Sequence, residues 1–173
     1  MANDTWRTPL KIFEYYDGFY NFKYDICADH TNALCEHYFT EEQNCLKQNG
    51  YVKAGNYVWC NPPYSNPLTF VQHLINQSFI YGIGSVLLVN HDMSVEWSSL
   101  LCEIECTHHV FIASGSKQDK TYCNGRIAFI DENNKPIAGN NKGQIAVIIP
   151  PFVRYGEPKV KYMQLSSIMC LQL

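Results

Sequence analysis

Two consecutive prolines end an apolar run near the middle of the chain, and they restrict its fold more than any other feature. The run Val58–Cys60 has the composition of a buried strand, and Asn61 and Pro62–Pro63 follow it directly. Because proline fixes φ and has no N–H, neither a strand nor a helix continues through this pair. The residue before each proline is held extended. The sequence therefore predicts a stiff turn at the carboxyl end of a strand, the edge where open α/β sheets bind ligands.

The predicted turn carries groups that suit a planar ligand bearing an amine. The Asn61 side chain can donate and accept hydrogen bonds, the carbonyls of Pro62 and Pro63 have no competing N–H, and Tyr64 offers an aromatic face. The simpler interpretation is a rigid loop without a ligand, because Pro-Pro after a strand and Asn-Pro at a turn are both common. The complete Asn-Pro-Pro-Tyr run after an apolar strand is much rarer by chance.

Length and composition limit the classes to which the chain can belong. A length of 173 residues suits one domain with a real core, and we expect residues 1–173 to form it without a separate large target-recognition domain. No apolar run reaches the roughly 20 residues that span a bilayer, and residues 1–4 lack the features of a secretory signal. The 8 cysteines are therefore expected to be reduced, buried side chains.

Charge is distributed unevenly along the chain. Up to Ser114 there are 5 Lys+Arg and 12 Asp+Glu, whereas from Gly115 on there are 8 and 4, so the net charges of −7 and +4 sum to −3. A nucleic-acid partner requires local positive potential and not a positive total. The second part of the chain can supply that potential, although a merely solvated surface would show the same charges.

Apolar periodicity and turn residues predict alternating helices and strands. Thr8 and Pro9 suit the cap and the first position of a helix that Gly18 ends. Further helices are expected at 32–35, 68–81 and 95–101, and residues 40–43 open a helical or looped stretch. Strands are expected at 22–28, 58–60, 85–90, 107–113, 126–131 and 144–149, and residues 37–40 form a short strand or an extended link. This order predicts an α/β fold with a mostly parallel sheet, helices on both faces, and an antiparallel C-terminal hairpin made by the last two strands.

Six short stretches resemble, in order and with similar spacing, the phage-type DNA N6-adenine methyltransferase family. They cover most of the chain, from Trp6 to about Ile149. The resemblance implies a Rossmann-like methyltransferase fold in a single domain, S-adenosylmethionine as cofactor, and a flipped-out adenine as substrate. The stretches are Trp6-x-Thr8-Pro9, Tyr24-Asp25-Ile26-Cys27-Ala28, Asn32-Ala33-x-Cys35, Tyr38-Phe39-Thr40, Trp59-Cys60-Asn61-Pro62-Pro63-Tyr64-Ser65 and Gly125-Arg126-Ile127-Ala128-Phe129.

The resemblance implies that the catalytic residues are Asn61, Pro62, Pro63 and Tyr64. An adenine amine is a poor nucleophile because its lone pair is conjugated with the ring. The Asn61 side-chain oxygen and the Pro62 carbonyl would accept its two N–H groups, and Tyr64 would stack on the base. The amine would then attack the methyl group in line, with positioning and electrostatics supplying the rate.

The cofactor site implied by the resemblance departs from the family at one position. Asp25 would pair with the amino group of the cofactor, directly or through water. Asn44-Cys45-Leu46 stands where the family usually has Asp-Gly-Leu, so an amide replaces the acid that faces the cofactor's adenine. No Gly-x-Gly loop follows Asp25. The implied cofactor-binding residues are Trp6, Thr8, Pro9, Asp25, Cys27, Ala28, Asn44 and Asn61.

DNA contacts are expected from two segments at the catalytic edge, 65–67 and 114–126. Cations suit phosphates, whereas glutamine and asparagine can recognise adenine edges and arginine can recognise guanine; the longer segment could also be a mobile loop. The expected DNA-binding residues are Ser65, Asn66, Lys117, Gln118, Lys120, Asn124 and Arg126. We expect double-stranded DNA as partner, no membrane contact, a monomer or weak dimer, and the cytoplasm of a bacterial or phage-infected cell.

Other functions remain open on the sequence alone. RNA adenine, protein glutamine (which shares Asn-Pro-Pro-Tyr), and noncatalytic nucleic-acid binding are the alternatives. Cys102, Cys106, His108 and His109 are metal-ligand types, but no second pair has zinc-finger spacing, and we expect no metal. Asp92, just after a predicted strand, is either a site residue or a helix cap.

Overall fold

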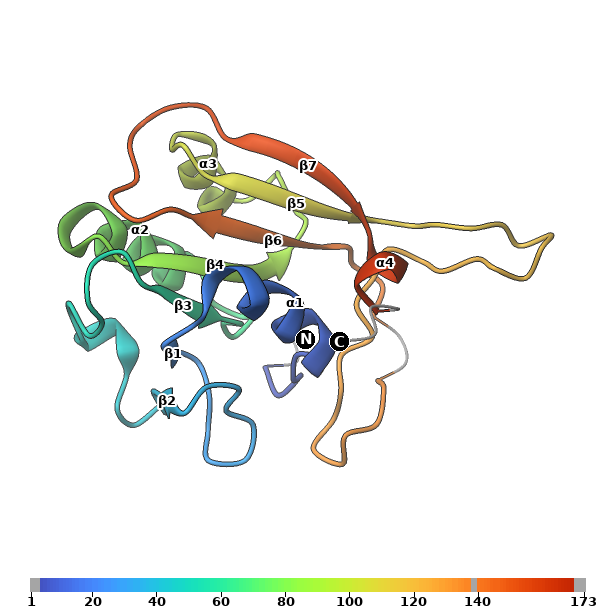
Figure 1. Cartoon of the computed structure of the whole chain (residues 1–173), viewed down its shortest axis with the longest axis horizontal. Coiled ribbons are helices and arrows are strands. Elements are labelled where there is room, and N and C mark those ends of the chain that lie inside the picture. The colour runs from blue at the N-terminus through green and yellow to red at the C-terminus, as the bar shows by residue number, and fades with distance from the viewer. Residues whose placement is uncertain (1–3, 138–139, 170–173) are drawn as a thin grey trace.

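The computed structural model describes residues 4–137 and 140–169, and a seven-stranded mixed sheet forms its centre (Figure 1). The strand order is β2-β1-β3-β4-β6-β5-β7. Within the described residues β6 alone runs opposite to its neighbours, because β4–β6 and β5–β6 are antiparallel and the other pairs are parallel. The strands are β1 Tyr24–Asp25, β2 His37–Tyr38, β3 Tyr57–Cys60, β4 Gly84–Asn90, β5 Thr107–Ile112, β6 Gln144–Ile149 and β7 Lys159–Gln164.

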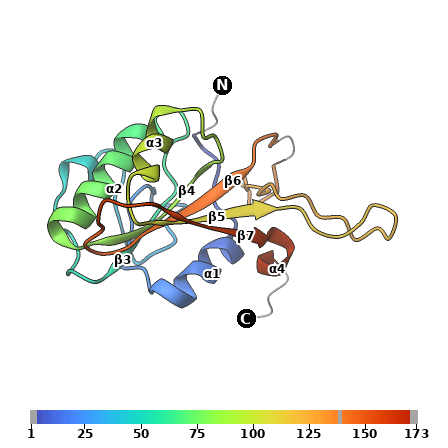
Figure 2. The same cartoon turned by 90° about the horizontal axis from the view of Figure 1, so that it is seen from above.

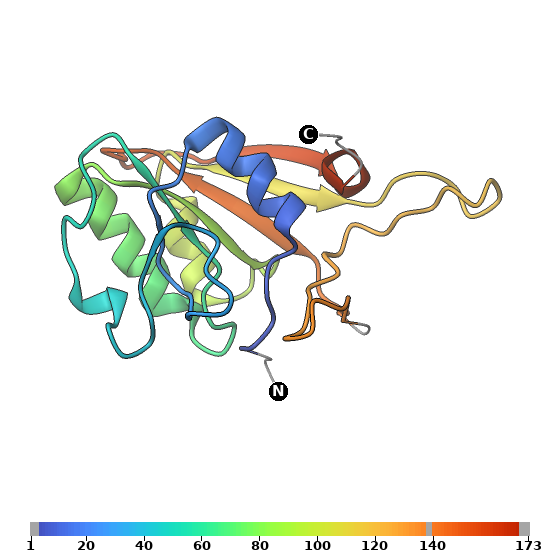
Figure 3. The same ribbon diagram turned by 60° about the horizontal axis from the view of Figure 1, so that its bottom comes forward.

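Helices cover both faces of this sheet. α1 Leu10–Tyr20 and α4 Leu165–Met169 lie on one face, and α2 Pro67–Tyr81 and α3 Glu96–Cys102 lie on the other (Figure 2), as a further view confirms (Figure 3). A short 3₁₀ helix, η1 Cys45–Lys47, precedes β3. Among the described residues, no helix has the length and apolar character needed to cross a membrane.

β3 lies at the centre of the packing because its residues alternate between two apolar clusters. Val58 and Cys60 belong to the cluster beneath α2 and α3, whereas Trp59 belongs to the one beneath α1. The Trp59 ring is fully buried and meets Phe13 edge-on, with ring centroids 5.6 Å apart. A strand buried on both faces requires apolar residues throughout, which explains its unbroken apolar sequence.

Several predicted elements are confirmed with shifted boundaries. α2 and α3 match the helices expected at 68–81 and 95–101, and β4, β5 and β6 match the expected strands. The strand expected at 22–28 is reduced to β1, because the chain bends at Ile26 and Cys27, although the Ile26 and Ala28 N–H groups still bond the Trp59 and Phe39 carbonyls. The short helix expected at 32–35 is wrong; these residues form turns in which the Asp29 carbonyl accepts from Asn32 and Ala33.

The strand expected at 126–131, and with it the predicted hairpin, is wrong. Ile127 and Phe129 are buried as an alternating strand requires, but the Ile127 N–H bonds the Gln144 side chain and its carbonyl bonds Asn140. Side chains therefore take the hydrogen bonds that a neighbouring strand would make with Ile127. In this segment only Ile130 forms isolated β-bridges, with Arg7 and with Pro136. β6 instead pairs with β5 across the long connection 113–143. β7 was not predicted, because its residues are exposed on both faces at the sheet edge.

The ends of α1 also differ from expectation. Pro9 occupies the cap position without a side-chain cap bond, and the buried Thr8 hydroxyl has no partner among the described residues. The helix passes through Gly18 and ends at Tyr20, where Asn21 adopts φ 49° and its N–H bonds the Asp17 carbonyl. A left-handed residue with this bond ends a helix as a glycine would.

Two glycines in helical surroundings are expected to respond oppositely to alanine. Gly82 has φ +63° at the end of α2, and an added Cβ would overlap the Phe152 ring, so Gly82→Ala should lower the free energy of unfolding by about 2–4 kcal/mol. Gly18 has no atom within 4 Å of its would-be Cβ, so Gly18→Ala should raise it by about 0.5–1 kcal/mol. Urea unfolding of both variants measures this, and equal effects would contradict it.

Candidate active site

The Asn-Pro-Pro-Tyr turn joins the carboxyl end of β3 to α2. The Asn66 N–H bonds the Pro63 carbonyl at 3.2 Å, and Pro67 then opens the helix. β3 pairs in parallel with β1 and with β4, so residues that follow those strands reach the same edge of the sheet. Asn61 therefore lies at the edge where the parallel strands end.

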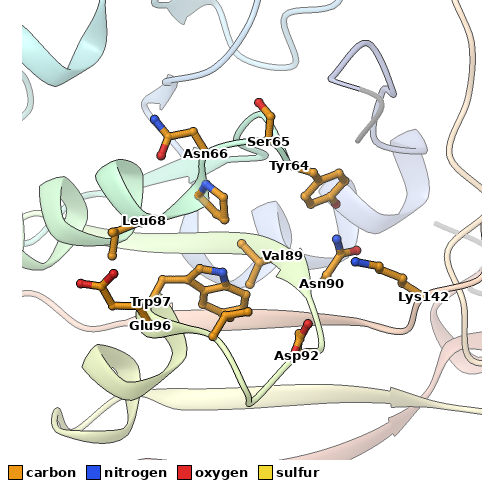
Figure 4. A pocket seen from close by; sticks show the side chains of 12 residues that line it. Tyr64, Ser65, Asn66, Leu68, Val89, Asn90, Asp92, Glu96, Trp97 and Lys142 are labelled. Carbon is orange, nitrogen blue, oxygen red and sulfur yellow. The ribbon is translucent and has the colours of Figure 1, made fainter. Parts of the chain in front are cut away.

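Two cavities flank the turn, and both touch Ser65 and Asn66. The larger one, of about 590 Å³, lies toward β1, β2 and η1 and includes Asn61 in its wall. The smaller one, of about 340 Å³, lies between the turn, the end of β4 and α3, and includes Tyr64 in its wall (Figure 4). Side chains of the turn can therefore contact a ligand in either cavity.

The amide of Asn61 has a defined orientation. Its Nδ2 donates to the Trp6 carbonyl at 3.3 Å, and because a carbonyl only accepts, the nitrogen must face Trp6. Its Oδ1 is buried and has no partner among the described residues. A buried acceptor without a donor is destabilising, and it is rare in native proteins unless a ligand completes it.

The N-terminal segment of the described chain crosses over the turn. The Asp4 carboxylate accepts from the Ser65 N–H at 3.0 Å and from the Ser65 hydroxyl at 2.6 Å. Arg7 forms a two-bond bridge with Ile130. Trp6 packs on Phe129 with centroids 5.6 Å apart. These contacts connect the turn to the family-like stretch at 125–129.

Tyr64 presents a neutral ring to the smaller cavity. Its ring meets Phe129 edge-on at 5.7 Å, and its hydroxyl is buried with no partner in the described part of the chain. Burial raises the pKa of the phenol far above its ordinary value. The phenol is therefore neutral at physiological pH.

The expected cofactor residues divide between the cavity wall and its support. Of the expected set, Cys27, Ala28, Asn44 and Asn61 line the larger cavity, and the other four residues do not. The expected residues outside the wall are Trp6, Thr8, Pro9 and Asp25. Asn44, in place of the family acid, uses its Oδ1 to accept the Leu46 N–H and so caps η1.

Three carboxylates in the wall of the larger cavity, Asp4, Asp29 and Glu41, were not predicted. Glu41 follows β2, and Asp29 follows the segment that leaves β1. An acidic residue at the end of the strand beside the first is the usual partner of a ribose hydroxyl in dinucleotide-binding sheets. Because Glu41 directly follows the expected strand 37–40, its position in the sequence could have indicated a cofactor-binding residue.

Asp25 supports the cavity from beneath. It is buried, and its two oxygens accept from the backbone N–H groups of Cys27 (3.3 Å) and Leu34 (3.2 Å). Burial raises the pKa of its carboxyl to about 6, and the two N–H groups act in the opposite direction. Asp25 therefore fixes the loop whose residues Cys27 and Ala28 line the cavity.

Three thiols lie between β1, η1 and the turn. Cys27 Sγ and Cys60 Sγ are 3.6 Å apart, and Cys45 is buried beside them. Burial raises the pKa of the Cys27 and Cys60 thiols, so both stay neutral. The seven described cysteines are free, although Cys102 is exposed, contrary to expectation.

The expected DNA-binding residues lie at two places. Ser65 and Asn66 stand between the two cavities. The others belong to segment 114–126, here called the arm, which extends beyond the sheet (Figure 1) and in which paired backbone bonds join Ser114 and Cys123. Lys117 lies over the Tyr122 ring at 5.3 Å. The arm residues from the expected set are Lys117, Gln118, Lys120, Asn124 and Arg126, all exposed.

The other sequence candidates have structural contacts. Asp92 accepts from the Ser94 N–H and hydroxyl, as a turn or cap residue does, and also lines the smaller cavity. Cys106 Sγ donates to the Leu101 carbonyl, and His109 bonds the Tyr16 hydroxyl at 3.2 Å. Within residues 4–137 and 140–169 no group of three or more His, Cys, Asp or Glu side chains could hold a metal ion.

The turn, its buried acceptor and the cavities on either side define a class of protein. A strand ending in Asn-Pro-Pro-Tyr at the carboxyl edge of a sheet resembles the site of methyltransferases that act on amino groups. A family model described as DNA N-6-adenine-methyltransferase (Dam) matches residues 1–169. The chain therefore belongs to this family, which confirms the resemblance found in the sequence.

Curated relatives agree with the family match. The chain is 36% identical over 168 residues to the DNA N-6-adenine-methyltransferase of Haemophilus phage HP1 (strain HP1c1), covering 95% of this chain and 89% of the relative. It is 31% identical over 174 residues to the protein of the same name from Escherichia phage T1, covering 96% of this chain and 71% of the relative.

The buried Asp25 carboxyl predicts a pH dependence of stability. Burial raises the pKa of this carboxyl from 3.8 to about 6, so between these pH values the folded protein binds more protons than the unfolded chain. Stability from this group is thus present at low pH and lost as the pH rises. Relative to Asp25→Asn, the wild type should lose about 2 kcal/mol of unfolding free energy between pH 4 and 7. Urea unfolding of both proteins at several pH values tests this, and a constant difference would contradict it.

Proposed function

We propose that this protein transfers a methyl group from S-adenosylmethionine to the N6 amine of an adenine flipped out of double-stranded DNA. Membership of the family supports adenine-N6 methylation of DNA as the activity, as do the names of the two phage relatives. The observation that carries the proposal is the buried, unpartnered Oδ1 of Asn61, at the turn where two cavities meet. The fold we propose is a Rossmann-like methyltransferase fold in a single domain.

The larger cavity is the proposed place of the cofactor. Its volume of about 590 Å³ lies in the range of small-molecule sites. The carboxylates of Asp29 and Glu41 suit ribose hydroxyls and an ammonium group, and the Asn44 side chain suits a purine edge. Asp25 would contribute from beneath, by fixing the loop that carries Cys27. Bound S-adenosylmethionine would supply an electrophilic methyl group on its sulfonium.

The smaller cavity is the proposed place of the target base. From there the adenine amine would approach the turn, with its two N–H groups donating to Asn61 Oδ1 and to the Pro62 carbonyl. Those bonds would favour a pyramidal nitrogen with its lone pair directed at the methyl group of a bound cofactor. On transfer the electrons of the broken C–S bond would stay with the sulfur, and one of the two N6 protons directed at Asn61 and Pro62 would be lost to solvent. The neutral Tyr64 ring, buried against Phe129, would lie against the base. Burial of Asn61 keeps water from competing for its oxygen.

The proposed DNA surface runs from the turn to the arm. Lys117 and Lys120 are exposed on the arm, and Lys142 lines the smaller cavity, so cations lie both beside the base site and away from it. Cations placed this way would hold phosphates on either side of a flipped nucleotide. We propose a monomer or weak dimer that acts in the cytoplasm, where DNA is accessible to it.

Removal of the Asn61 amide should abolish transfer without unfolding the protein. Asn61→Ala loses one 3.3 Å bond and an unpartnered oxygen, so its fold should persist, whereas turnover should fall at least about 100-fold. Asn76→Ala is the matched control, because Asn76 is exposed on α2 and lies outside both cavities. The assay is transfer of labelled methyl to DNA, RNA and protein acceptors. Normal transfer to DNA by Asn61→Ala would refute the assignment, and transfer to RNA or protein alone would redirect it.

Loss of the two arm lysines should weaken DNA binding for all sequences. Replacing Lys117 and Lys120 together by Ala removes two exposed cations, so the logarithmic salt slope of the binding constant should flatten by up to about 2. The control replaces Lys47 and Lys53 together, which gives the same charge change at two exposed residues that lie outside segment 114–126 and outside both cavities. Titrations at several salt concentrations compare the two, and an unaltered slope in the arm variant would place the DNA surface elsewhere.

A further inference from the structure

The wall of the smaller cavity contains an asparagine that sequence analysis did not select. Asn90 is the last residue of β4 and is half-buried. Figure 4 shows its side chain below Tyr64, with the end of the Lys142 side chain beside it. An amide can offer either a donor or an acceptor to a ligand, so its orientation decides what the cavity recognises.

A buried glutamine sets that orientation. Gln144 is 1% exposed, and its Oε1 accepts from the Ile127 N–H at 3.0 Å, while its Nε2 donates to the Lys142 carbonyl at 2.8 Å. A backbone N–H only donates and a carbonyl only accepts, so the two backbone groups together allow one orientation of the Gln144 amide. The same Nε2 also lies 3.2 Å from Asn90 Oδ1.

The orientation of Asn90 follows from that of Gln144. Because Gln144 presents a donor, the Asn90 atom facing it must be the oxygen. The Asn90 nitrogen therefore faces away from Gln144, and within the described residues it has no bond of its own. The wall beneath Tyr64 thus offers N–H donors, from the Asn90 amide and from the Lys142 ammonium.

We propose that Asn90 recognises the flipped base by donating from Nδ2 to one of its ring nitrogens. The inference rests on the proposed function, which places the base in this cavity. In adenine the N6 amine is flanked by two ring nitrogens, N1 and N7, and both are pure acceptors. With the amine directed at Asn61 and Pro62, a donor in the wall complements one of these nitrogens. Guanine carries a hydrogen on N1 and an oxygen at C6, so it mismatches the Asn61 and Pro62 acceptors.

The test replaces single ring nitrogens of the target. The methylated adenines of a plasmid are first mapped with the wild-type protein, and duplexes are then made with adenine, 1-deazaadenine or 7-deazaadenine at one mapped position. Each analogue exchanges one acceptor for a C–H group. The rate constant kcat/KM is measured on all three duplexes with the wild type, Asn90→Ala and Asn90→Asp.

The wild type should lose about 10–100-fold on one analogue and little on the other. Asn90→Ala should lose a similar factor on natural adenine and no further factor on that analogue. Asn90→Asp keeps an acceptor for Gln144 but lacks the donor, so it should show the same loss of discrimination. The ratio between duplexes within one variant cancels any general weakening of DNA binding or of folding.

Two results would overturn the inference while the proposed function stands. One is a wild type that methylates all three duplexes at similar rates. The other is Asn90→Ala retaining the wild-type ranking of the analogues. Absence of transfer to natural adenine by the wild type would instead refute the proposed function, and this inference with it.

Discussion

Burial of β3 on both faces fixes the position of Asn61 at the site. Trp59 packs among the aromatic residues of α1, and Cys60 beneath α2, so a shift by one residue would move each side chain into the opposite cluster, where its size does not fit. The prolines then stop the strand at one place. Asn61 therefore reaches the sheet edge at a height set by core packing and not by loop conformation.

Backbone groups with a single hydrogen-bonding role orient the polar side chains around the turn. The Trp6 carbonyl turns Asn61, the Ile127 N–H and the Lys142 carbonyl turn Gln144, and Gln144 turns Asn90. Each contact removes the ambiguity of an amide that could otherwise face either way. The result is an acceptor at the turn and a donor in the wall, which together match an amine beside a ring nitrogen.

The sequence predicted the turn, the helices that follow β3 and β4, and the family, because these depend on local chemistry and contiguous residues. The residues that form the wall of the smaller cavity could not be predicted from the sequence. Asn90 and Lys142 meet only because β6 lies beside β4, and that pairing joins distant parts of the chain. Segment 126–131 has the alternation of a strand, yet side chains of Gln144 and Asn140 bond its backbone instead. Asp25 was predicted at the correct strand end, but its burial depends on the packed loop around Leu34.

The connection 113–143 joins two strands that lie side by side, β5 and β6. Its ends are therefore held together by the sheet whatever its length, and doubling a flexible loop costs only about 0.6 kcal/mol. Within this connection, residues 115–122 lie beyond the paired bonds of Ser114 and Cys123, so they can be lengthened, shortened or exchanged with little effect on the seven-stranded sheet. Under the proposed function, target preference can diverge between related proteins through these residues, because they line neither cavity and touch no part of the turn.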